Sequence, residues 1–148
     1  MNIIIRKADE KDIEDIKYLI KELADSIGEK SCISEDYIVN YMLNPLMNIL
    51  IAEKNGEVVG LLSYSIRPNL YHASDCCMIE ELVVRKNHQN EGVGRILIST
   101  LIEIAINLKC AEISVTTLIN NEGAIKFYKL QGLTEEGLLL EKHLLTDI

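Results

Sequence analysis

Two spacings of apolar residues run through the first part of this 148-residue chain, and they predict strands and helices in turn. Residues 2–6 are rich in isoleucine, which predicts a buried strand inside a sheet. An amphipathic helix is predicted next, capped by Asp9 and ending near Gly28. Its apolar positions recur at steps of three and four, at Ile13, Ile16, Ile20, Leu23 and Ile27. Residues 34–43 predict a second, shorter helix that ends before Pro45.

A hairpin is predicted in the middle of the chain. Residues 48–53 and 57–66 flank Asn55-Gly56, a dipeptide that favours a tight type I′ turn. The two segments should therefore pair antiparallel. Residues 67–75 are predicted to form a loop.

Strands and helices alternate in the second half of the chain. Residues 76–85 predict a central strand, and residues 93–108 predict a helix so apolar that it should be buried on most sides. Residues 111–117 are β-branched and predict a strand. A helix over residues 121–131 and a final strand over residues 138–144 complete the order, which indicates an α/β fold with a mixed sheet.

Length and composition indicate one folded domain over residues 1–148. The net charge of −8 disfavours binding to nucleic acid or to an anionic membrane, and it mildly favours a cationic partner. An anionic cofactor would need a local exception to this charge. Arg85, Lys86, His88 and Arg95 supply one in a single short segment.

The chain also carries signs of its compartment. The apolar stretch within residues 1–6 is too short for a signal peptide, because a charged residue already follows at Arg6. No apolar run approaches the ~20 residues of a membrane span. We therefore expect a cytoplasmic protein. Its four cysteines lack the spacing of metal ligands, so we expect no metal site and predict reduced, structural thiols at Cys32, Cys76, Cys77 and Cys110.

The segment between the predicted central strand and the long helix carries the first candidate binding site. Gly92 and Gly94 let the backbone approach a ligand closely where a helix begins, and the unpaired N–H groups of a helix start favour phosphate. A P-loop is excluded because Arg95-Ile96, and not Lys followed by Ser or Thr, comes after Gly94. The dinucleotide fingerprint fails too, because Leu97 stands where its third glycine belongs.

Two motifs together carry a family resemblance. Gln89-x-x-Gly92-x-Gly94 resembles the pyrophosphate-binding motif of the GNAT superfamily of acyl-CoA-dependent N-acyltransferases. The segment from Asn121 to Leu133 resembles the second signature of that family, Asn-x-x-Ala-x-x-Phe-Tyr-x-x-x-Gly-Phe. The chain departs from these patterns at Asn90, where glycine is common, and at Leu133, which replaces phenylalanine.

The resemblance implies a three-layer α/β/α fold of the GNAT type, acetyl-CoA as the acyl donor, and a homodimer. It implies a pyrophosphate held by the loop, a pantetheine arm paired with the central strand, and further contacts from the helix after the last conserved asparagine. The cofactor-binding residues so predicted are Leu82, Val83, Val84, Gln89, Asn90, Glu91, Gly92, Val93, Gly94, Arg95, Asn121, Ala124 and Tyr128.

Tyr128 is the position that matches the general acid of the family. Asn121, Ala124 and Tyr128 lie on one helix face, so a single stripe can follow the cofactor to its sulfur. A phenol near pKa 10 can protonate a thiolate whose acid form has a pKa of about 8.5. Two alternatives stay open: Tyr128 as a packed core tyrosine, and Asn121 as a helix cap only.

A carboxylate before the apolar run of the central strand is the candidate general base. Glu80 and Glu81 occupy this place, and strict alternation across a sheet would put one of them in the cleft. Glu80 is preferred, because it shares its parity with Leu82 and Val84 and resembles an acidic position of some aminoglycoside-type members. Solvated acids at a strand end are the alternative; the histidines are weaker candidates. For the oxyanion, the resemblance implies a main-chain N–H near Val83 or Val84.

Two functions follow from these residues. The first is an N-acetyltransferase that moves an acetyl group from acetyl-CoA to a primary amine by direct attack in a ternary complex, with a small amine, an aminoglycoside or a peptide as acceptor. The second is a non-catalytic acyl-CoA-binding sensor. Tyr128 and the two carboxylates favour the enzyme, because a sensor has no need of them.

Overall fold

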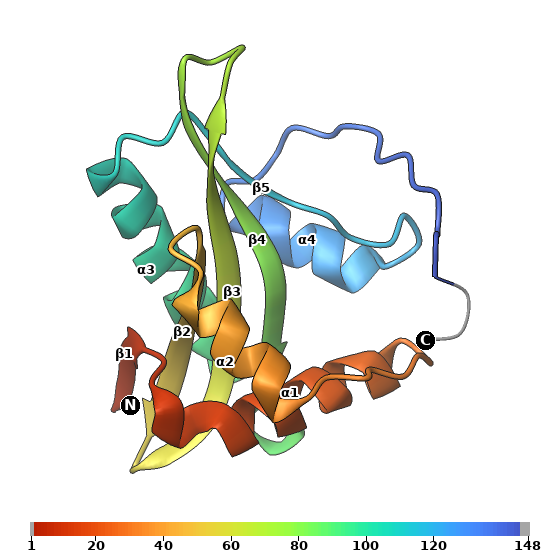
Figure 1. Ribbon diagram of the computed structural model, residues 1–148. Helices are drawn as coiled ribbons and strands as arrows, with labels where there is room; N and C mark the ends of the chain where they lie inside the picture. The colour runs from red at the N-terminus through yellow and green to blue at the C-terminus, as the bar shows by residue number, and fades with distance from the viewer. Residues whose placement is uncertain (1, 146–148) are drawn as a thin grey trace.

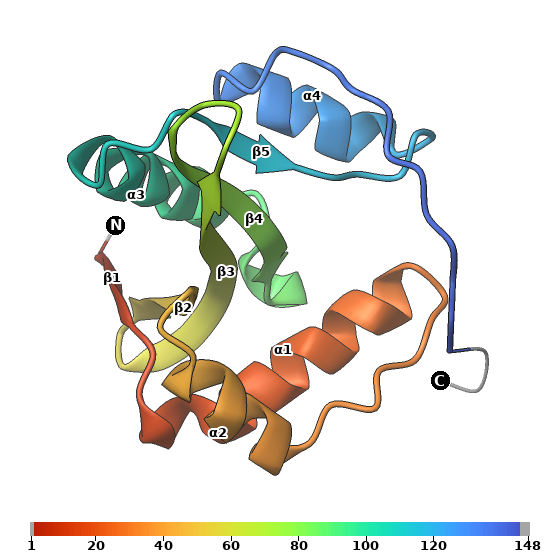
Figure 2. The same cartoon turned by 45° about the horizontal axis from the view of Figure 1, so that its top comes forward.

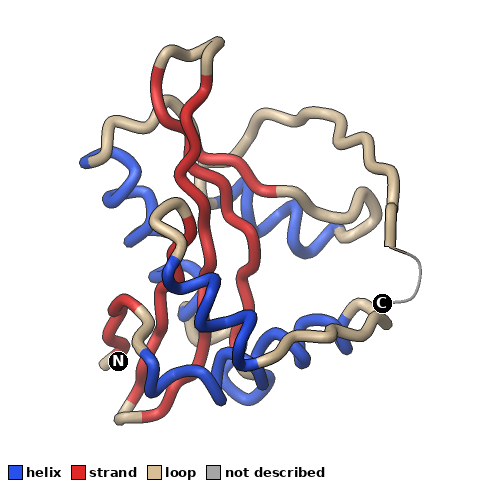
Figure 3. Tube along the Cα trace, in the orientation of Figure 1, coloured by secondary structure: helices blue, strands red, loops and turns tan. Residues whose placement is uncertain are grey.

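The computed structural model describes residues 2–145, and its centre is one five-stranded sheet in the order β1-β2-β3-β4-β5 (Figures 1 and 3). The first four strands are antiparallel, and β5 is parallel to β4. The mixed sheet predicted from the sequence is confirmed. The strands are β1 (Ile3–Lys7), β2 (Met47–Lys54), β3 (Glu57–Asn69), β4 (Ser74–Val84) and β5 (Ile113–Val115).

Helices cover both faces of the sheet, which gives the three layers that the family resemblance implied (Figure 2). One face carries α1 (Ile13–Ser26) and α2 (Glu35–Leu43). The other carries α3 (Val93–Asn107) and α4 (Glu122–Leu130). Short 3-10 turns precede α1 at Glu10–Asp12 and follow β4 at Lys86–His88.

Each face of the sheet has its own hydrophobic core. On the α3 side, buried residues of the sheet such as Leu62 and Ile79 pack with Leu97 and Leu101 of α3. On the α1 and α2 side, the core is built from Ile16, Leu19, Ile38, Ile49, Ile51, Val58, Leu61 and Val83. Burial of apolar area on both faces, at about 25 cal/mol per Å², is what holds the three layers together.

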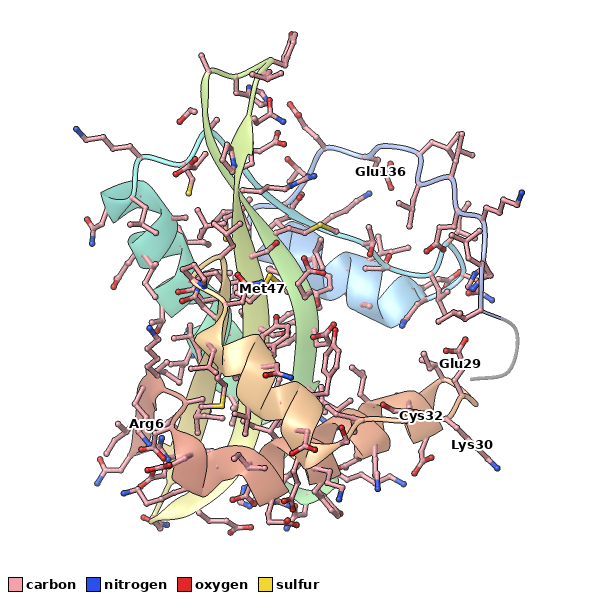
Figure 4. The ribbon with its side chains drawn as sticks, in the orientation of Figure 1. Arg6, Glu29, Lys30, Cys32, Met47 and Glu136 are labelled. Carbon is pink, nitrogen blue, oxygen red and sulfur yellow. The ribbon has the colours of Figure 1, made fainter. Side chains whose placement is uncertain are left out.

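The start of α1 is fixed by charge as well as by packing. Asp9 caps the 3-10 turn through a capping box with Asp12, as the sequence predicted for Asp9. Arg6, which is labelled in Figure 4, is the penultimate residue of β1. It donates two hydrogen bonds to the buried Asp12 carboxylate, both 2.8 Å, and one to Glu53. The Arg6 guanidinium holds the pKa of Asp12 below its usual range.

Local signals placed most element ends correctly. Asn55 and Gly56 both have positive φ, 52° and 79°, as the predicted type I′ turn requires. Ser34 caps α2 through the N–H of Tyr37, and α4 begins after its cap Asn121.

Two predictions about the strands are wrong: one about the position of a strand in the sheet and one about where two strands end. β1 lies at the edge of the sheet and not inside it, and the side chain of Ile4 is 60% exposed. Residues 67–75 are mostly strand, because β3 and β4 stay paired to Asn69↔Ser74 and leave only residues 70–73 as a turn.

The C-terminal third departs most from the sequence prediction. β5 is only three residues long, and residues 138–144 form no strand, since they find no neighbouring strand to pair with among the described residues. α3 is buried along one side and not on most sides, with Ile106 exposed. Between residues 2 and 145, no helix combines the length and the hydrophobicity that a membrane crossing needs.

Candidate active site

β4 and β5 separate halfway along β4, and this opening is the frame of the site. Only Cys77–Ile79 of β4 pair with Ile113–Val115 of β5. Beyond that point, residues 81–84 pair with β3 on one edge, and residues 80–84 pair with no strand of the described chain on the other. α4 lies beyond this free edge, on the β5 side (Figures 1 and 2).

Backbone groups of β4 point into the opening at alternate residues. The N–H of Arg85 donates to the carbonyl oxygen of Val59 on the β3 side. Since successive residues of a strand aim their N–H groups at opposite edges, those of Val84 and Leu82 face the free edge. The Gln89 side chain also reaches this edge and donates to the carbonyl oxygen of Val84 at 3.1 Å.

A β-bulge at Glu80 puts both candidate bases on one face of the sheet. Glu81 pairs with Ser63 and Ile79 pairs with Tyr64, so Glu80 is the extra residue. Ser65 Oγ donates to Glu80 at 2.8 Å and Ser63 Oγ donates to Glu81 at 2.5 Å. Both carboxylates therefore lie on the α1 and α2 face.

The bulge overturns the parity argument made for Glu80. Leu82 and Val84 pack on the α3 side, whereas Glu80 lies on the opposite face. The two carboxylates also differ in their surroundings. Glu80 is exposed, while Glu81 is half-buried, and burial raises the pKa of Glu81 despite the hydrogen bond from Ser63 that lowers it.

The loop before α3 has the geometry of an anion site. Gly92 is the N-cap of α3 with φ 84°, and Asn90 also has a positive φ of 65°, which explains how asparagine serves where glycine is common. The first turn of α3 leaves the N–H groups of Val93, Gly94 and Arg95 without intrahelical partners, and the first helical bond is from Ile96 to Gly92. The side chain of Val93 itself is buried in the core.

Gly94 lies where two helices pack closely. A Cβ built on it would lie 3.3 Å from Cζ of Phe127 in α4 and 3.9 Å from Leu82. The missing side chain lets α4 approach the start of α3. The second glycine of the motif therefore positions the α4 wall as well as the loop.

The positive cluster predicted around this loop is smaller than expected. Arg85 is turned away from it: it donates to Asp15 and to the carbonyl oxygen of Val58, and its guanidinium lies 4.6 Å from the ring centroid of Tyr18. His88 sits beside Glu91, and Glu91 pairs with Lys54 at 2.7 Å. Lys86 and Arg95, both exposed, are the remaining cations of the predicted cluster.

A cavity of about 560 Å³ lies between α1 and the end of β4. Its β4 wall is formed by residues 82–84, with Lys86 and Gln89 at the loop end. Its α1 wall is Tyr18, Glu22, Leu23, Asp25 and Ser26. The α1 wall thus adds two carboxylates to those of Glu80 and Glu81.

The face of α4 predicted to follow the cofactor carries Asn121, Ala124 and Tyr128. Asn121 accepts a hydrogen bond from the N–H of Ala124 at 3.1 Å, so it acts as the helix cap. Tyr128 packs against the α3-side core and makes an edge-on contact with Phe127. Burial raises the pKa of Tyr128 to about 12.

Two residues of the site were missed from the sequence. Tyr41 of α2 lies near Glu81 and Ser63, and burial, with the charge of Glu81, raises its pKa to about 12. Glu22 of α1 accepts the N–H of Lys86 at 3.0 Å and so holds the loop against α1. The sequence showed only that both residues belong to predicted helices, and helical periodicity cannot tell a core residue from one that lines a cavity.

The sequence matches a known family over most of its length. The model of the Acetyltransferase (GNAT) family matches residues 14–133. The chain is 31% identical over 139 residues to a thialysine N-epsilon-acetyltransferase of Mus musculus, with 86% of this chain and 82% of that relative covered. It is 28% identical over 128 residues to an aminoalkylphosphonate N-acetyltransferase of Salmonella typhimurium, with the same coverage of both chains.

Solved structures share the fold at lower identity. A putative acetyltransferase from Agrobacterium tumefaciens superposes with a TM-score of 0.85 at 22% identity, covering 95% of this chain and 99% of that one. An aminoglycoside acetyltransferase from an uncultured soil metagenomic sample, in complex with trehalose, superposes with a TM-score of 0.83 at 19% identity over 98% and 97%.

Proposed function

The chain belongs to the acetyltransferase (GNAT) family, whose members use acetyl-CoA as the acyl donor, and we propose that it acetylates the primary amine of a small cationic acceptor. The observation that carries this proposal is the free edge of β4 at residues 80–84. At one end of this edge is a loop with the geometry of an anion site, at the other are two carboxylates, and Tyr128 belongs to α4, the helix beyond the edge.

Cofactor binding is assigned along this edge. The N–H groups of Val93, Gly94 and Arg95 would hold the pyrophosphate, with Lys86 and Arg95 as the nearby exposed cations. The outward backbone groups of Leu82 and Val84 would pair with the amides of the pantetheine arm as a further strand would. Asn121 and Ala124, on the same predicted face of α4 as Tyr128, would contact the pantetheine arm from the other side. Gln89 would have to release the Val84 carbonyl for such pairing.

The reaction moves two protons. Glu81 takes the first from the acceptor ammonium, with Glu80 beside it, and the neutral amine then attacks the thioester carbon. A C–N bond forms, and an outward N–H of β4 that the pantetheine arm leaves unpaired, nearer to Glu81 than to the loop, stabilises the oxyanion. The nitrogen of the tetrahedral species then loses one proton, which is the second proton moved in the reaction, and the C–S bond breaks. This proton ends on the CoA sulfur. The products are the acetylated amine, CoA thiol and one proton released from Glu81 to water.

Tyr128 acts at the sulfur as a hydrogen-bond donor during C–S cleavage. Complete proton transfer from a phenol of pKa about 12 to a thiolate whose acid form is about 8.5 costs about 5 kcal/mol. A full transfer that leaves a phenolate is therefore disfavoured, more than the ordinary phenol pKa had suggested. Tyr128 instead keeps its proton and donates a hydrogen bond to the sulfur during cleavage. The proton that finally binds the sulfur comes from the acceptor nitrogen.

The acidic cavity wall sets the acceptor class. Glu22 and Asp25 line the cavity, and Glu80 and Glu81 lie on the same side of the sheet. The neighbouring carboxylates Glu80 and Glu81 at the proposed acceptor end, with Glu22 and Asp25 further along the same face, favour an acceptor with at least one ammonium group besides the reacting one. The mouse relative is named for thialysine, so thialysine and similar diamines are the first acceptors to test.

The first experiment is calorimetric titration with acetyl-CoA and with CoA, followed by a thiol-release assay over diamines, amino acids, aminoalkylphosphonates and aminoglycosides. We expect micromolar binding, equivalent to about −8 kcal/mol, and turnover with a diamine. Binding without turnover on any amine would favour the sensor. Failure to bind acetyl-CoA would contradict the proposal as a whole.

The pH profile of kcat/KM identifies the base. The acid limb should follow Glu81 and rise with pH, because the carboxylate form is the active one. Ser63→Ala removes a hydrogen bond that lowers the Glu81 pKa, so the limb should move to higher pH. Glu80→Gln removes a neighbouring negative charge, so the limb should move to lower pH. If Glu80→Gln abolishes the limb instead, Glu80 is the base.

A further inference from the structure

Three metal-binding side chains meet at the other end of β4, away from the proposed acetyl-transfer site. His72 is in the β3–β4 turn, Cys76 is on β4 and Glu112 directly precedes β5. One donor atom from each residue lies within 4.8 Å of the other two. The Nε2 of His72 and Oε2 of Glu112 are 3.5 Å apart. None of the three takes part in the proposed reaction.

The backbone around these donors is tied down on both sides. The N–H of His72 donates to Asn69 Oδ1 at 2.9 Å, which fixes the turn. The N–H of Cys77, which belongs to the peptide group directly after Cys76, donates to the carbonyl oxygen of Glu112 at 3.0 Å, so the backbone next to the thiol is bonded to the residue that carries the carboxylate. Ala111 donates to the carbonyl oxygen of Asp75 at 2.8 Å and extends the same connection. The three donors are therefore held together by the folded backbone before any ligand binds.

We propose that His72, Cys76 and Glu112 form a zinc site. Imidazole nitrogen, thiolate sulfur and carboxylate oxygen are the protein ligands of Zn²⁺, at about 2.0–2.3 Å from the metal. Around a tetrahedral ion such donors stand roughly 3.3–3.6 Å from one another. The His72 to Glu112 distance already has this value, and the widest separation in the cluster needs side-chain movement of roughly 1 Å.

The burial of the three residues matches a site that is entered from solvent. Cys76 is 1% exposed, while the side chains of His72 and Glu112 are 33% and 47% exposed and form the mouth. Binding would release the thiol proton to water and leave a thiolate and a carboxylate that balance the two charges of the metal. A water molecule would complete the four ligands.

A metal here would link β4 and β5 at the end where the two strands are hydrogen-bonded to each other. Their pairing begins at Cys77↔Ile113, one residue beyond Cys76 and Glu112, and covers only three residue pairs. An ion bridging Cys76 and Glu112 would add a link next to the first of these pairs. It would also attach the turn between β3 and β4 to the same point.

The test uses the full chain after EDTA treatment, titrated with Zn²⁺ and, as a control, with Mg²⁺, which prefers oxygen ligands. We expect Tm to rise with Zn²⁺, saturating at one ion per chain, and to be unchanged by Mg²⁺. Co²⁺ in place of zinc should give a thiolate-to-metal absorption band that is lost in Cys76→Ser.

Variants separate this site from adventitious binding. His72→Ala and Glu112→Gln should each weaken Zn²⁺ binding by at least about tenfold, while His143→Ala and Cys110→Ser, outside the cluster, should not. His72 is exposed, so its variant decides the matter even if Cys76→Ser fails to fold. No saturable zinc binding, or the same affinity in His72→Ala as in the wild type, would overturn the proposal.

Discussion

The two walls of the opening beside β4 are built in different ways. The wall formed by β4, α1 and the start of α3 belongs to the doubly covered part of the sheet, and every buried residue of the described chain lies between Asp12 and Ala105. The opposite wall consists of β5, α4 and residues 131–145. Within that part of the described chain no residue is buried.

The first wall is therefore held in place by the buried cores, whereas the second wall is held by a few partly exposed contacts. The anion loop, the carboxylates and the free edge of β4 are part of the packed wall. Tyr128 depends on three residue pairs between β4 and β5, on Phe127 against Gly94, and on Leu133 at the core margin. We therefore expect mutations in the first wall to change stability, and mutations in the second to change turnover.

The largest effect should come from the core of the packed wall. Leu97→Ala removes a fully buried side chain and should lower the free energy of unfolding by about 2–5 kcal/mol. Leu140, in the C-terminal segment, is 83% exposed, and Leu140→Ala should stay within about 0.5 kcal/mol. Urea unfolding of both variants measures the contrast. A loss above about 1 kcal/mol in Leu140→Ala would mean that the second wall is packed in solution.

Tyr128→Phe should have the next largest effect, and on a different quantity. Loss of the phenol should lower kcat by about 100-fold or more, while acetyl-CoA affinity and Tm change little, because the ring remains. Tyr71→Phe, at an exposed position in the β3–β4 turn, is the matched control. Unchanged turnover in Tyr128→Phe would remove the hydroxyl from the mechanism.

Ion pairs allow the same contrast between the walls. Arg6→Met leaves the buried Asp12 carboxylate without its cation and should cost about 2 kcal/mol at pH 7, a figure reduced because Arg6 is partly exposed. Lys129→Met breaks the exposed pair with Glu136 and should cost less than about 0.5 kcal/mol. Urea unfolding at pH 7 compares them.

The Arg6 contribution also has a pH signature. In the wild type, Arg6 lowers the pKa of Asp12 below the pKa of about 4 that an aspartate has in the unfolded chain. The ion pair therefore stabilises the fold fully above about pH 4, and this stabilisation is lost as pH falls through the pKa of Asp12 in the folded protein. Without Arg6, the largest influence that lowers the Asp12 pKa is gone, while burial still acts to raise it. The stability gap between wild type and Arg6→Met should therefore narrow on acidification, and a gap independent of pH would contradict this assignment.

The smallest effect is expected where the walls touch. Gly94→Ala brings a methyl group to 3.3 Å from Phe127, so the α4 ring must move by a few tenths of an ångström. Turnover should fall by less than about tenfold, with stability within about 1 kcal/mol. Gly137→Ala, where no atom lies within 4 Å, is the control. A stability loss like that of Leu97→Ala would show that the two walls form one packed unit.

The sequence predicted best what local chemistry determines. Caps at Asp9 and Asn121 and the Asn55-Gly56 turn were correct, because each rests on a hydrogen bond or a dihedral angle within a few residues. The loop predicted to hold the cofactor was located by motif, and Gly92 has the positive φ that a close backbone approach to a ligand favours, while its binding role stays a prediction.

Prediction failed where pairing partners decide the outcome. Residues 138–144 have the apolar composition of a strand but no strand to pair with between residues 2 and 145, and residues 67–69 look like a loop yet stay paired with β4. The bulge at Glu80 has no local signature, since both glutamates suit a regular strand end. Likewise, nothing in the spacing of His72, Cys76 and Glu112 indicates that the fold brings them together.

The bulge at Glu80 also bears on how this strand could change in evolution. Loss of one residue from a regular strand turns every later side chain to the wrong face. Loss of Glu80 would instead restore regular alternation and leave Ile79, Glu81, Leu82 and Val83 on the faces they now occupy. Position 80 is thus a place where the chain can gain or lose a residue, and with it a negative charge at the acceptor side, without disturbing the core.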